Sequence, residues 1–269
     1  MVDGDDYYLT RRALFNRCNL SPWAIAGQQF QESPQPLEIS WIREENQDFL
    51  SRLGEISDPT ERGLVFHEYC LSRFWVHENE EARPTGKRRL RHSYHSVLMG
   101  WGVDSNGPSG AILKGWAEHR FGLRTIYHQV ALAKEQEAYE QYTRERMRGM
   151  TSGLGMQLDL LYTYCQDELR RRHPGERWLT LYRGTHDAQA YTVKTAAHRR
   201  DLHLVELNTL SSFTDDPEIA WEFGSLVWKV QVPLAKIVSF SSLLPRSVLK
   251  GEQEFIVLGG DYLVRPVGC

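Results

Sequence analysis

Three short motifs in the last third of this 269-residue chain carry side chains that could act together in chemistry. The first motif, Tyr182-Arg183-Gly184, closes a run of residues typical of a strand. The planar guanidinium of Arg183 can bind two oxygens of a phosphate at once, and Gly184 leaves the neighbouring backbone accessible to a ligand. Taken alone, the motif is explained more simply as a surface arginine before a turn.

The second motif is Ser211-Ser212-Phe213-Thr214, which precedes a short predicted helix. Hydroxyl groups at the end of a strand can orient a nearby carboxylate by hydrogen bonding. A Ser/Thr turn that caps the following helix is the simpler alternative for this motif alone.

The third motif places Glu252 and Glu254 just before an apolar run, residues 255–258, which is typical of a strand buried on both faces. Residues two apart on an extended chain point to the same side, so the two carboxylates would face one region. A carboxylate at the start of a buried strand is costly unless it is paired or used. An exposed acidic strand start remains the alternative.

The elements that must position these motifs fall into two parts. Residues 1 to about 175 are predicted to be mainly helical, because apolar residues recur at helical spacing between turn-rich breaks. Asp58 before Pro59 indicates a helix start. The predicted helices cover about 59–76, a segment from Ser93 to the turn at 104–108, Ile126 to Met147 as the longest, and Gly153 to Arg172.

From residue 177 onward, short runs of β-branched and aromatic residues alternate with turn residues, which indicates strands and hence an α+β fold. One short helix, capped by Asp216, is expected to turn Ile219, Ala220 and Phe223 inward. The predicted strands are 178–183, 203–207, 226–232, 237–240, 254–258 and 262–264.

Composition excludes several classes of function. The formal net charge of -3 argues against a protein that wraps nucleic acid, which needs a broad positive surface. The basic stretches at 87–92 and 170–173 are either solvated surface or docking sites for an acidic protein surface. The four cysteines are scattered, which predicts neither a metal site nor a disulfide framework. An acidic N-terminus and the lack of a long apolar run predict a cytoplasmic protein with no membrane span.

Taken together, the order of the three motifs resembles the Arg-Ser-Glu class of mono-ADP-ribosyltransferases, which includes cholera-like toxins, clostridial binary toxins and vertebrate ecto-enzymes. Ala220 supports this alignment, because it lies six residues after Thr214, as it does after the family's Ser-Thr-Ser. The chain departs from the family at Phe213, which replaces the central hydroxyl residue. Over its whole length, the chain further resembles the bacterial dinitrogenase reductase ADP-ribosyltransferases, above all in the segments 181–187 and 208–216.

The resemblance implies a role for each motif residue, with NAD as the co-substrate and no metal. Arg183 would bind the NAD diphosphate, and Gly184 would offer its backbone to the nicotinamide amide. Ser212 would hold Glu254, whose carboxylate would stabilise the positive charge on the ribose as nicotinamide leaves. Glu252 would orient an incoming arginine and accept its proton.

The aromatic residues near the motifs could contact the same co-substrate. Tyr182, Phe213, Trp221 and Phe223 could stack on nicotinamide or adenine, although packing in a core is the commoner role of such residues. We expect Tyr182 and Phe223 to be the NAD contacts.

The resemblance also implies an architecture and a partner. The helical region, residues 1–175, would support the co-substrate and dock partners. It would pack on a catalytic core, residues 176–269, built as a β-sandwich of mostly antiparallel strands. The enzyme would transfer ADP-ribose to one arginine of the nitrogenase iron protein, with a P-II nitrogen-signalling protein as its regulator. The alternatives are an NAD glycohydrolase, a transferase for another protein, nucleic acid or small guanidine, and a binding module that has lost catalysis.

Overall fold

Local capping signals set the boundaries of the principal helices. The computed structural model describes residues 16–74, 93–132, 136–186, 193–195, 202–244 and 253–268. Asp58 caps α6 (Pro59–Arg73) by accepting hydrogen bonds from two backbone N–H groups, and Thr151 caps α10 (Ser152–Arg172) by accepting one from the Leu154 N–H. A reciprocal pair of serine hydrogen bonds opens α7 (Tyr94–Val103). The helices predicted over 59–76, after Ser93 and over 153–172 are therefore confirmed.

The other helices in the described part of the chain are mostly short. They are α2 (Pro22–Ala26), α3 (Gln28–Glu32), α4 (Ile42–Glu45), α5 (Gln47–Glu55), α8 (Pro108–Phe121), α9 (Gln136–Gly149), α11 (Pro217–Glu222) and the 3-10 turn η2 (Leu234–Lys236). None of the described helices combines the length and the apolar content that a bilayer crossing requires.

The main sheet contains six antiparallel strands in the order β4-β5-β3-β6-β8-β7. Its strands are β3 (Trp178–Thr185), β4 (Val193–Thr195), β5 (His203–Thr214), β6 (Leu226–Pro233), β7 (Ile237–Phe240) and β8 (Glu254–Pro266). Strand β5 also pairs with β8, so the strands β5, β3, β6 and β8 close into a small barrel. The mixed α+β class is confirmed. The two-sheet sandwich is not confirmed, because the pairings form one sheet that closes on itself.

The two longest strands unite segments that the sequence predicts separately. The strands predicted at 254–258 and 262–264 are both parts of β8, which continues through two glycines between them. Likewise, β5 contains both the predicted strand 203–207 and the Ser211–Thr214 motif. The two strands run alongside each other on both sides of a β-bulge, which explains their length.

The prediction of one long helix over Ile126–Met147 is wrong. This segment begins with a two-stranded hairpin, β1 (Tyr127–His128) and β2 (Val130–Ala131), and only α9 is helical. The side chain of Asn208 on β5 accepts hydrogen bonds from the backbone N–H groups of Ile126 and Tyr127 and donates one to the Tyr127 carbonyl. These contacts satisfy the backbone in extended form, so a helix has no advantage there. The longest described helix is α10.

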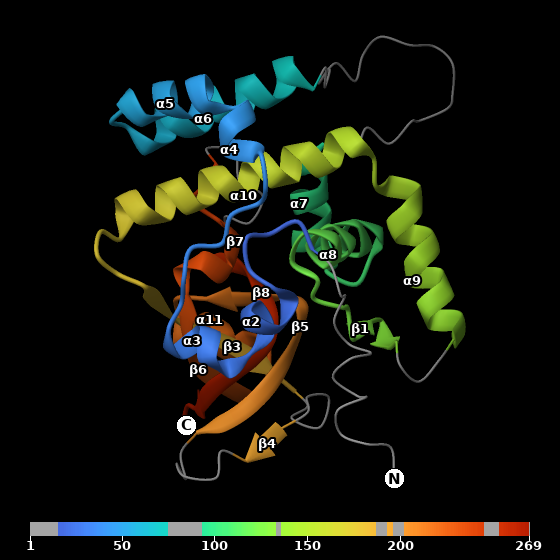
Figure 1. The fold of residues 1–269 in the computed structure, drawn as a ribbon. Helices are drawn as coiled ribbons and strands as arrows, with labels where there is room; N and C mark the ends of the chain where they lie inside the picture. Colours follow the sequence, from blue (N-terminus) through green and yellow to red (C-terminus); the bar gives the residue numbers. More distant parts are fainter. Residues whose placement is uncertain are drawn as a thin grey trace.

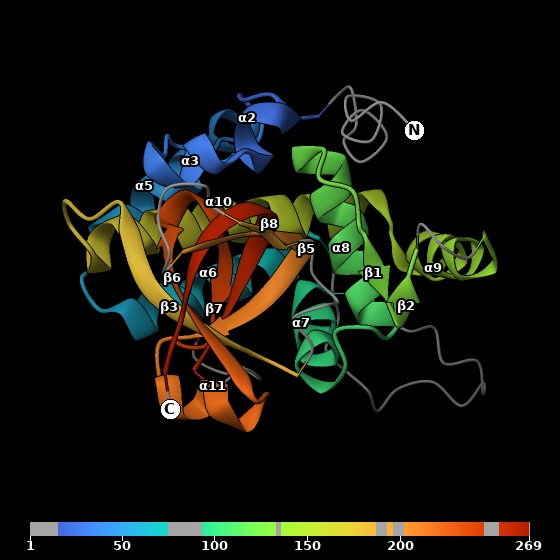
Figure 2. The ribbon, with the colours of Figure 1, turned by 90° about the horizontal axis from the view of Figure 1, so that it is seen from below.

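Helix α10 lies between the α5–α6 pair and the barrel (Figure 1). The apolar stripe of this helix, Leu154, Leu158, Leu161 and Cys165, is buried, and it belongs to a hydrophobic core that continues into the strands. Helices α7 and α8 stand at one side of the barrel beside β5, whereas α11 lies near one end of it (Figure 2).

Buried charges fix the helices against α10. Arg62 on α6 pairs with Glu168 on α10 at 2.5 Å, and both side chains are almost fully buried. Asp159 on α10 accepts hydrogen bonds from Arg120 at 2.6 Å and from the Trp116 indole at 2.7 Å. Because each buried carboxylate is paired, the cost of removing it from water is offset.

Candidate functional site

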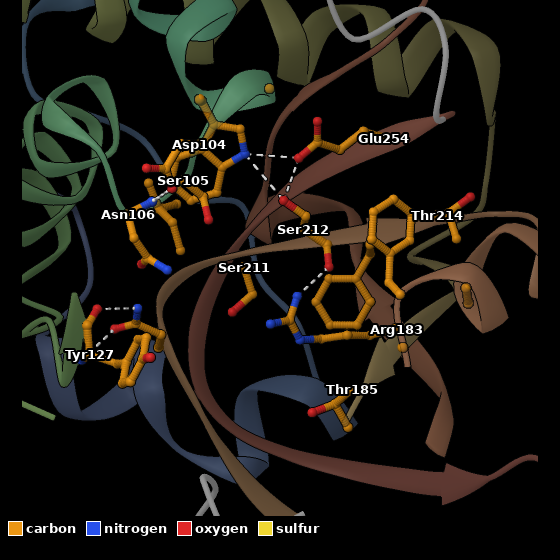
Figure 3. A pocket seen from close by; sticks show the side chains of 18 of the residues that line it. Asp104, Ser105, Asn106, Tyr127, Arg183, Thr185, Ser211, Ser212, Thr214 and Glu254 are labelled. Carbon is orange, nitrogen blue, oxygen red and sulfur yellow. Dashed lines mark hydrogen bonds between the residues drawn. The ribbon is translucent and has the colours of Figure 1, made fainter. Parts of the chain in front are cut away.

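A cavity of about 650 Å³ opens between the α7–α8 turn and the ends of strands β3, β5 and β8. This volume lies in the range of small-molecule sites, which is about 300–1,000 Å³. Its walls come from both the helical part and the barrel. The polar residues labelled on its walls in Figure 3 are Asp104, Ser105, Asn106, Tyr127, Arg183, Thr185, Ser211, Ser212, Thr214 and Glu254.

The strand pairings bring the three sequence motifs to this cavity. On β5, Thr214 lies opposite Tyr182 of β3 on one side and opposite Glu254 of β8 on the other. The Arg183 guanidinium donates a hydrogen bond to the Ser212 carbonyl oxygen, from Nη1 at 2.7 Å. The Ser212 hydroxyl in turn donates to Glu254 Oε1. Figure 3 shows both contacts as dashed lines. Three residues from separate segments therefore form one connected group.

Glu254 is a buried carboxylate at the first position of β8, with only 5% of its surface exposed. Besides the Ser212 hydroxyl, the indole Nε1 of Trp101 on α7 donates to Glu254 Oε1 at 2.8 Å. Hydrogen bonds to a carboxylate favour its charged form and offset the cost of burial. The site thus holds, at the cavity wall, a buried carboxylate that accepts two hydrogen bonds.

Gly184 has a packing role that the sequence does not reveal. A Cβ atom placed on Gly184 would lie 1.9 Å from the backbone oxygen of Ala220 and 3.1 Å from the backbone nitrogen of Gly224. The glycine therefore lets α11 sit directly against β3. Gly184 and Tyr182 both line the cavity. The contact of Gly184 with a ligand stays a prediction.

The aromatic residues near the motifs occupy different environments. Phe213 is buried beneath Arg183, with 6.0 Å between the guanidinium carbon and the ring centroid. Phe223 is 48% exposed and lines the cavity, so its predicted inward packing is wrong, whereas Ala220 on the same helix is buried. Trp221 is not among the residues that line the cavity.

Some predicted residues cannot be compared with the structure. Glu252 and the basic stretch 87–92 lie outside the described residues. The second basic stretch is partly engaged within the fold, because Arg172 binds the backbone and side chain of Ser242 and Arg170 pairs with Asp167.

Comparison with known proteins places the chain in a family. Residues 15–266 match the family described as dinitrogenase reductase ADP-ribosyltransferase (DRAT). The chain belongs to this family. A curated relative from Rhodospirillum rubrum is 36% identical over 249 residues, which cover 90% of each chain. That protein is named NAD(+)–dinitrogen-reductase ADP-D-ribosyltransferase. No solved structure was found to match the chain.

In this DRAT-family chain, the helical part contributes cavity residues that the sequence motifs do not reveal. The cavity wall on that side consists of Trp101, Gly102, Val103, Asp104, Ser105, Asn106, Lys114, Ile126 and Tyr127. The turn residues at 104–108 had indicated only the end of a helix. One signal was present in the sequence, since a lysine in the middle of an otherwise apolar helix face suggests a polar partner.

Lys114 places a buried amine in this wall, with 1% of its surface exposed. Its Nζ donates to Asn106 Oδ1 at 2.9 Å and to the Tyr127 carbonyl oxygen at 3.3 Å. A third contact, also 3.3 Å long, reaches the Nδ1 atom of His128, whose other ring nitrogen contacts Glu145 at 3.2 Å. The ammonium group therefore joins the α7–α8 turn to the β1 strand.

The charge of Lys114 is sensitive to pH near neutrality. Burial lowers the pKa of Lys114 to about 7; Asp104 opposes this shift and Arg183 adds to it. Burial also lowers the pKa of His128, and the neighbouring lysine lowers it further. Both shifts favour the uncharged forms of these side chains.

We expect the difference in the free energy of unfolding between the unmodified protein and the Lys114→Met variant to change with pH. The folded pKa of Lys114, about 7, is below the 10.5 of the unfolded chain, so the unfolded state binds more protons between these values. Stability due to this group therefore rises with pH, by up to about 1.4 kcal/mol per pH unit. Urea unfolding of both proteins from pH 7.5 to 9.5 measures the difference. A difference that is constant with pH would contradict the shift.

Within the described ranges, no group of three or more His, Cys, Asp or Glu side chains is arranged to hold a metal ion. The polar groups that line the cavity are suited to an organic ligand that carries both charge and hydrogen-bonding groups.

Proposed function

We propose that this chain is an NAD-dependent mono-ADP-ribosyltransferase that modifies one arginine of dinitrogenase reductase, the nitrogenase iron protein. One arrangement supports the proposal above all. Arg183, Ser212 and Glu254, from three separate motifs, line one cavity in a chain whose curated relative is named as an ADP-ribosyltransferase of dinitrogen reductase. The modification would inactivate the iron protein reversibly and so regulate nitrogen fixation.

The residues of the cavity fit NAD as a co-substrate. Arg183 would bind the diphosphate, because its guanidinium matches the geometry of phosphate oxygens. Tyr182 and Phe223 would contact the aromatic rings, and the 48% exposure of Phe223 leaves its ring accessible to a ligand. Gly184 would place its backbone beside the nicotinamide amide.

The proposed reaction breaks the bond between the nicotinamide nitrogen and C1′ of the ribose. The bonding electrons go to nicotinamide, which leaves as a neutral molecule, and positive charge develops on the ribose. The Glu254 carboxylate would stabilise that charge, as carboxylates do in glycosidases. A nitrogen of the target arginine then bonds to C1′ and releases one proton, which Glu252 would accept.

Glu252 is the residue that would separate transfer from hydrolysis. A guanidinium has a pKa above about 12 and must be oriented and deprotonated to attack, whereas water needs less help. We expect Glu252→Gln to lower arginine transfer by about a hundredfold or more and to retain hydrolysis of NAD. Measuring nicotinamide release and protein labelling on the same samples tests this. An equal loss of both activities would refute the separate role.

The remaining parts of the proposal concern organisation and control. Residues 1–175 would support the co-substrate and dock partners, and residues 176–269 would form the catalytic core. The enzyme would act in the cytoplasm, with a P-II nitrogen-signalling protein as its regulator.

The decisive experiment is anaerobic labelling with isotopically marked NAD. Purified nitrogenase iron protein is added with and without a P-II protein and ADP, and mass spectrometry locates the label. One labelled arginine on the iron protein is the expected result. Nicotinamide release without labelling would favour an NAD glycohydrolase, and labelling of another protein in a cell extract would change the target. The absence of nicotinamide release under all these conditions would favour a binding module.

A further inference from the structure

The helical part of the molecule contributes one side chain directly to the buried carboxylate. Trp101 lies in the last turn of α7, and 3% of its surface is exposed. Its indole Nε1 lies 2.8 Å from Glu254 Oε1 and 3.2 Å from the Ser212 hydroxyl oxygen. One N–H group therefore contacts both Ser212 and Glu254.

The chemistry of the indole makes this contact one-directional. An indole N–H donates hydrogen bonds and cannot accept them, whereas a serine hydroxyl does both. Trp101 can therefore only donate to Glu254, and the carboxylate oxygen is the acceptor. Such a contact favours the ionised carboxylate. Ser212 accepts from Trp101 and donates to Glu254, so the three groups polarise one another in a closed set.

The fold fixes the position of the indole from two directions. At the start of α7, the backbone N–H of Tyr94 donates to the Gln157 side chain of α10 at 3.1 Å, and both groups are buried. Near its end, α7 approaches α8 so closely that a Cβ on Gly100 would lie 2.1 Å from the Ser109 hydroxyl oxygen. Because both ends of α7 are held, the direction of the Trp101 ring is set by the helix and not by a loop.

We propose that Trp101 is a positioning residue that holds the Glu254 carboxylate ionised and correctly oriented. The inference rests on the proposed transferase function, in which Glu254 stabilises the charge on the ribose. It also gives the helical part a defined task in the reaction, because the donor comes from outside the strand motifs.

The test compares Trp101→Phe with a matched control, Trp116→Phe. Both tryptophans are buried, and both donate an indole hydrogen bond to a carboxylate, but Trp116 serves Asp159 away from the cavity. We expect Trp101→Phe to lower the turnover number for nicotinamide release about 10- to 100-fold, the factor that one hydrogen bond to a charged group is worth. The KM for NAD should change little, and the acid limb of the pH–rate profile should move to higher pH. Trp116→Phe should shift neither the acid limb nor the KM.

Equal losses in the two variants with unchanged pH profiles would overturn the proposal, because they would indicate a general loss of stability. A second measurement separates this failure from a failure of the proposed function. The indole N–H resonance of Trp101 in NMR, identified by its disappearance in Trp101→Phe, should titrate with Glu254 and stop titrating in Glu254→Gln. A resonance that changes neither with pH nor on the Glu254→Gln substitution would refute the contact, even if the protein proved inactive.

Discussion

Nicotinamide release and protein labelling should both fall by about a thousandfold in the Glu254→Gln variant. The neutral amide has nearly the shape of the carboxylate and can still accept the hydrogen bond from Trp101 through its oxygen. It lacks the charge that would stabilise the ribose cation, on which both transfer and hydrolysis depend. The measurement is the rate of each activity at saturating NAD, together with a thermal unfolding curve that shows the variant is folded.

The control for this loss is Glu222→Gln, which removes the same charge from the exposed end of α11. Glu222 is not among the cavity residues, so its variant measures the general effect of one less negative charge near the site. We expect activity within about twofold of the unmodified protein, because exposed charges are screened by solvent. Retained hydrolysis in Glu254→Gln would exclude Glu254 as the stabilising group.

The strand motifs could be found from the sequence because their signals are local. The apolar run after Glu254 and the turn residues around Arg183 and Ser212 each indicate a strand end without knowledge of the rest of the chain. Helix α10 is equally clear, since its apolar stripe, its final basic residues and the Pro174-Gly175 that follows them agree. The order of motifs then supplied the resemblance.

Features that depend on distant contacts were not predictable in the same way. The hairpin at Tyr127 has no glycine or proline to mark it, and its extended backbone is satisfied by the side chain of Asn208, 81 residues away. The closure of the barrel likewise depends on the pairing of β5 with β8, which no local pattern encodes. Such contacts override helical propensity because they satisfy the backbone N–H and C=O groups without a helix.

The contact between Trp101 and Glu254 is a further feature of the site that local sequence patterns do not predict. Apolar periodicity could place this residue on a helix, but not aim its indole at a strand 153 residues further along the chain. The sequence leads only to the expectation that the helical region packs on the core, helps to hold the co-substrate and docks partners, whereas the structure adds a direct hydrogen bond from this region to Glu254. The cavity is built by two parts of the chain, so its shape depends on how α7 and α8 are held against the barrel.

Gly184→Ala is expected to destabilise the protein by about 1–3 kcal/mol and to disturb the cavity. The new Cβ would lie 1.9 Å from the backbone oxygen of Ala220, so no change of side-chain rotamer can relieve the clash. Helix α11 must move away from β3, and it carries Phe223 at its end to a new position. Urea unfolding measures the loss of stability, and an increased KM for NAD would report the displaced ring.

The matched control is Gly153→Ala, in which the added Cβ meets no atom within 4 Å. Gly153 lies in the first turn of α10, where alanine is the better helix former, so stability should be unchanged or rise by up to about 1 kcal/mol. Since both variants add one methyl group to a glycine in regular structure, their difference isolates the contact with α11. If Gly184→Ala proved as stable as Gly153→Ala, the close packing of α11 on β3 would not explain why position 184 is a glycine.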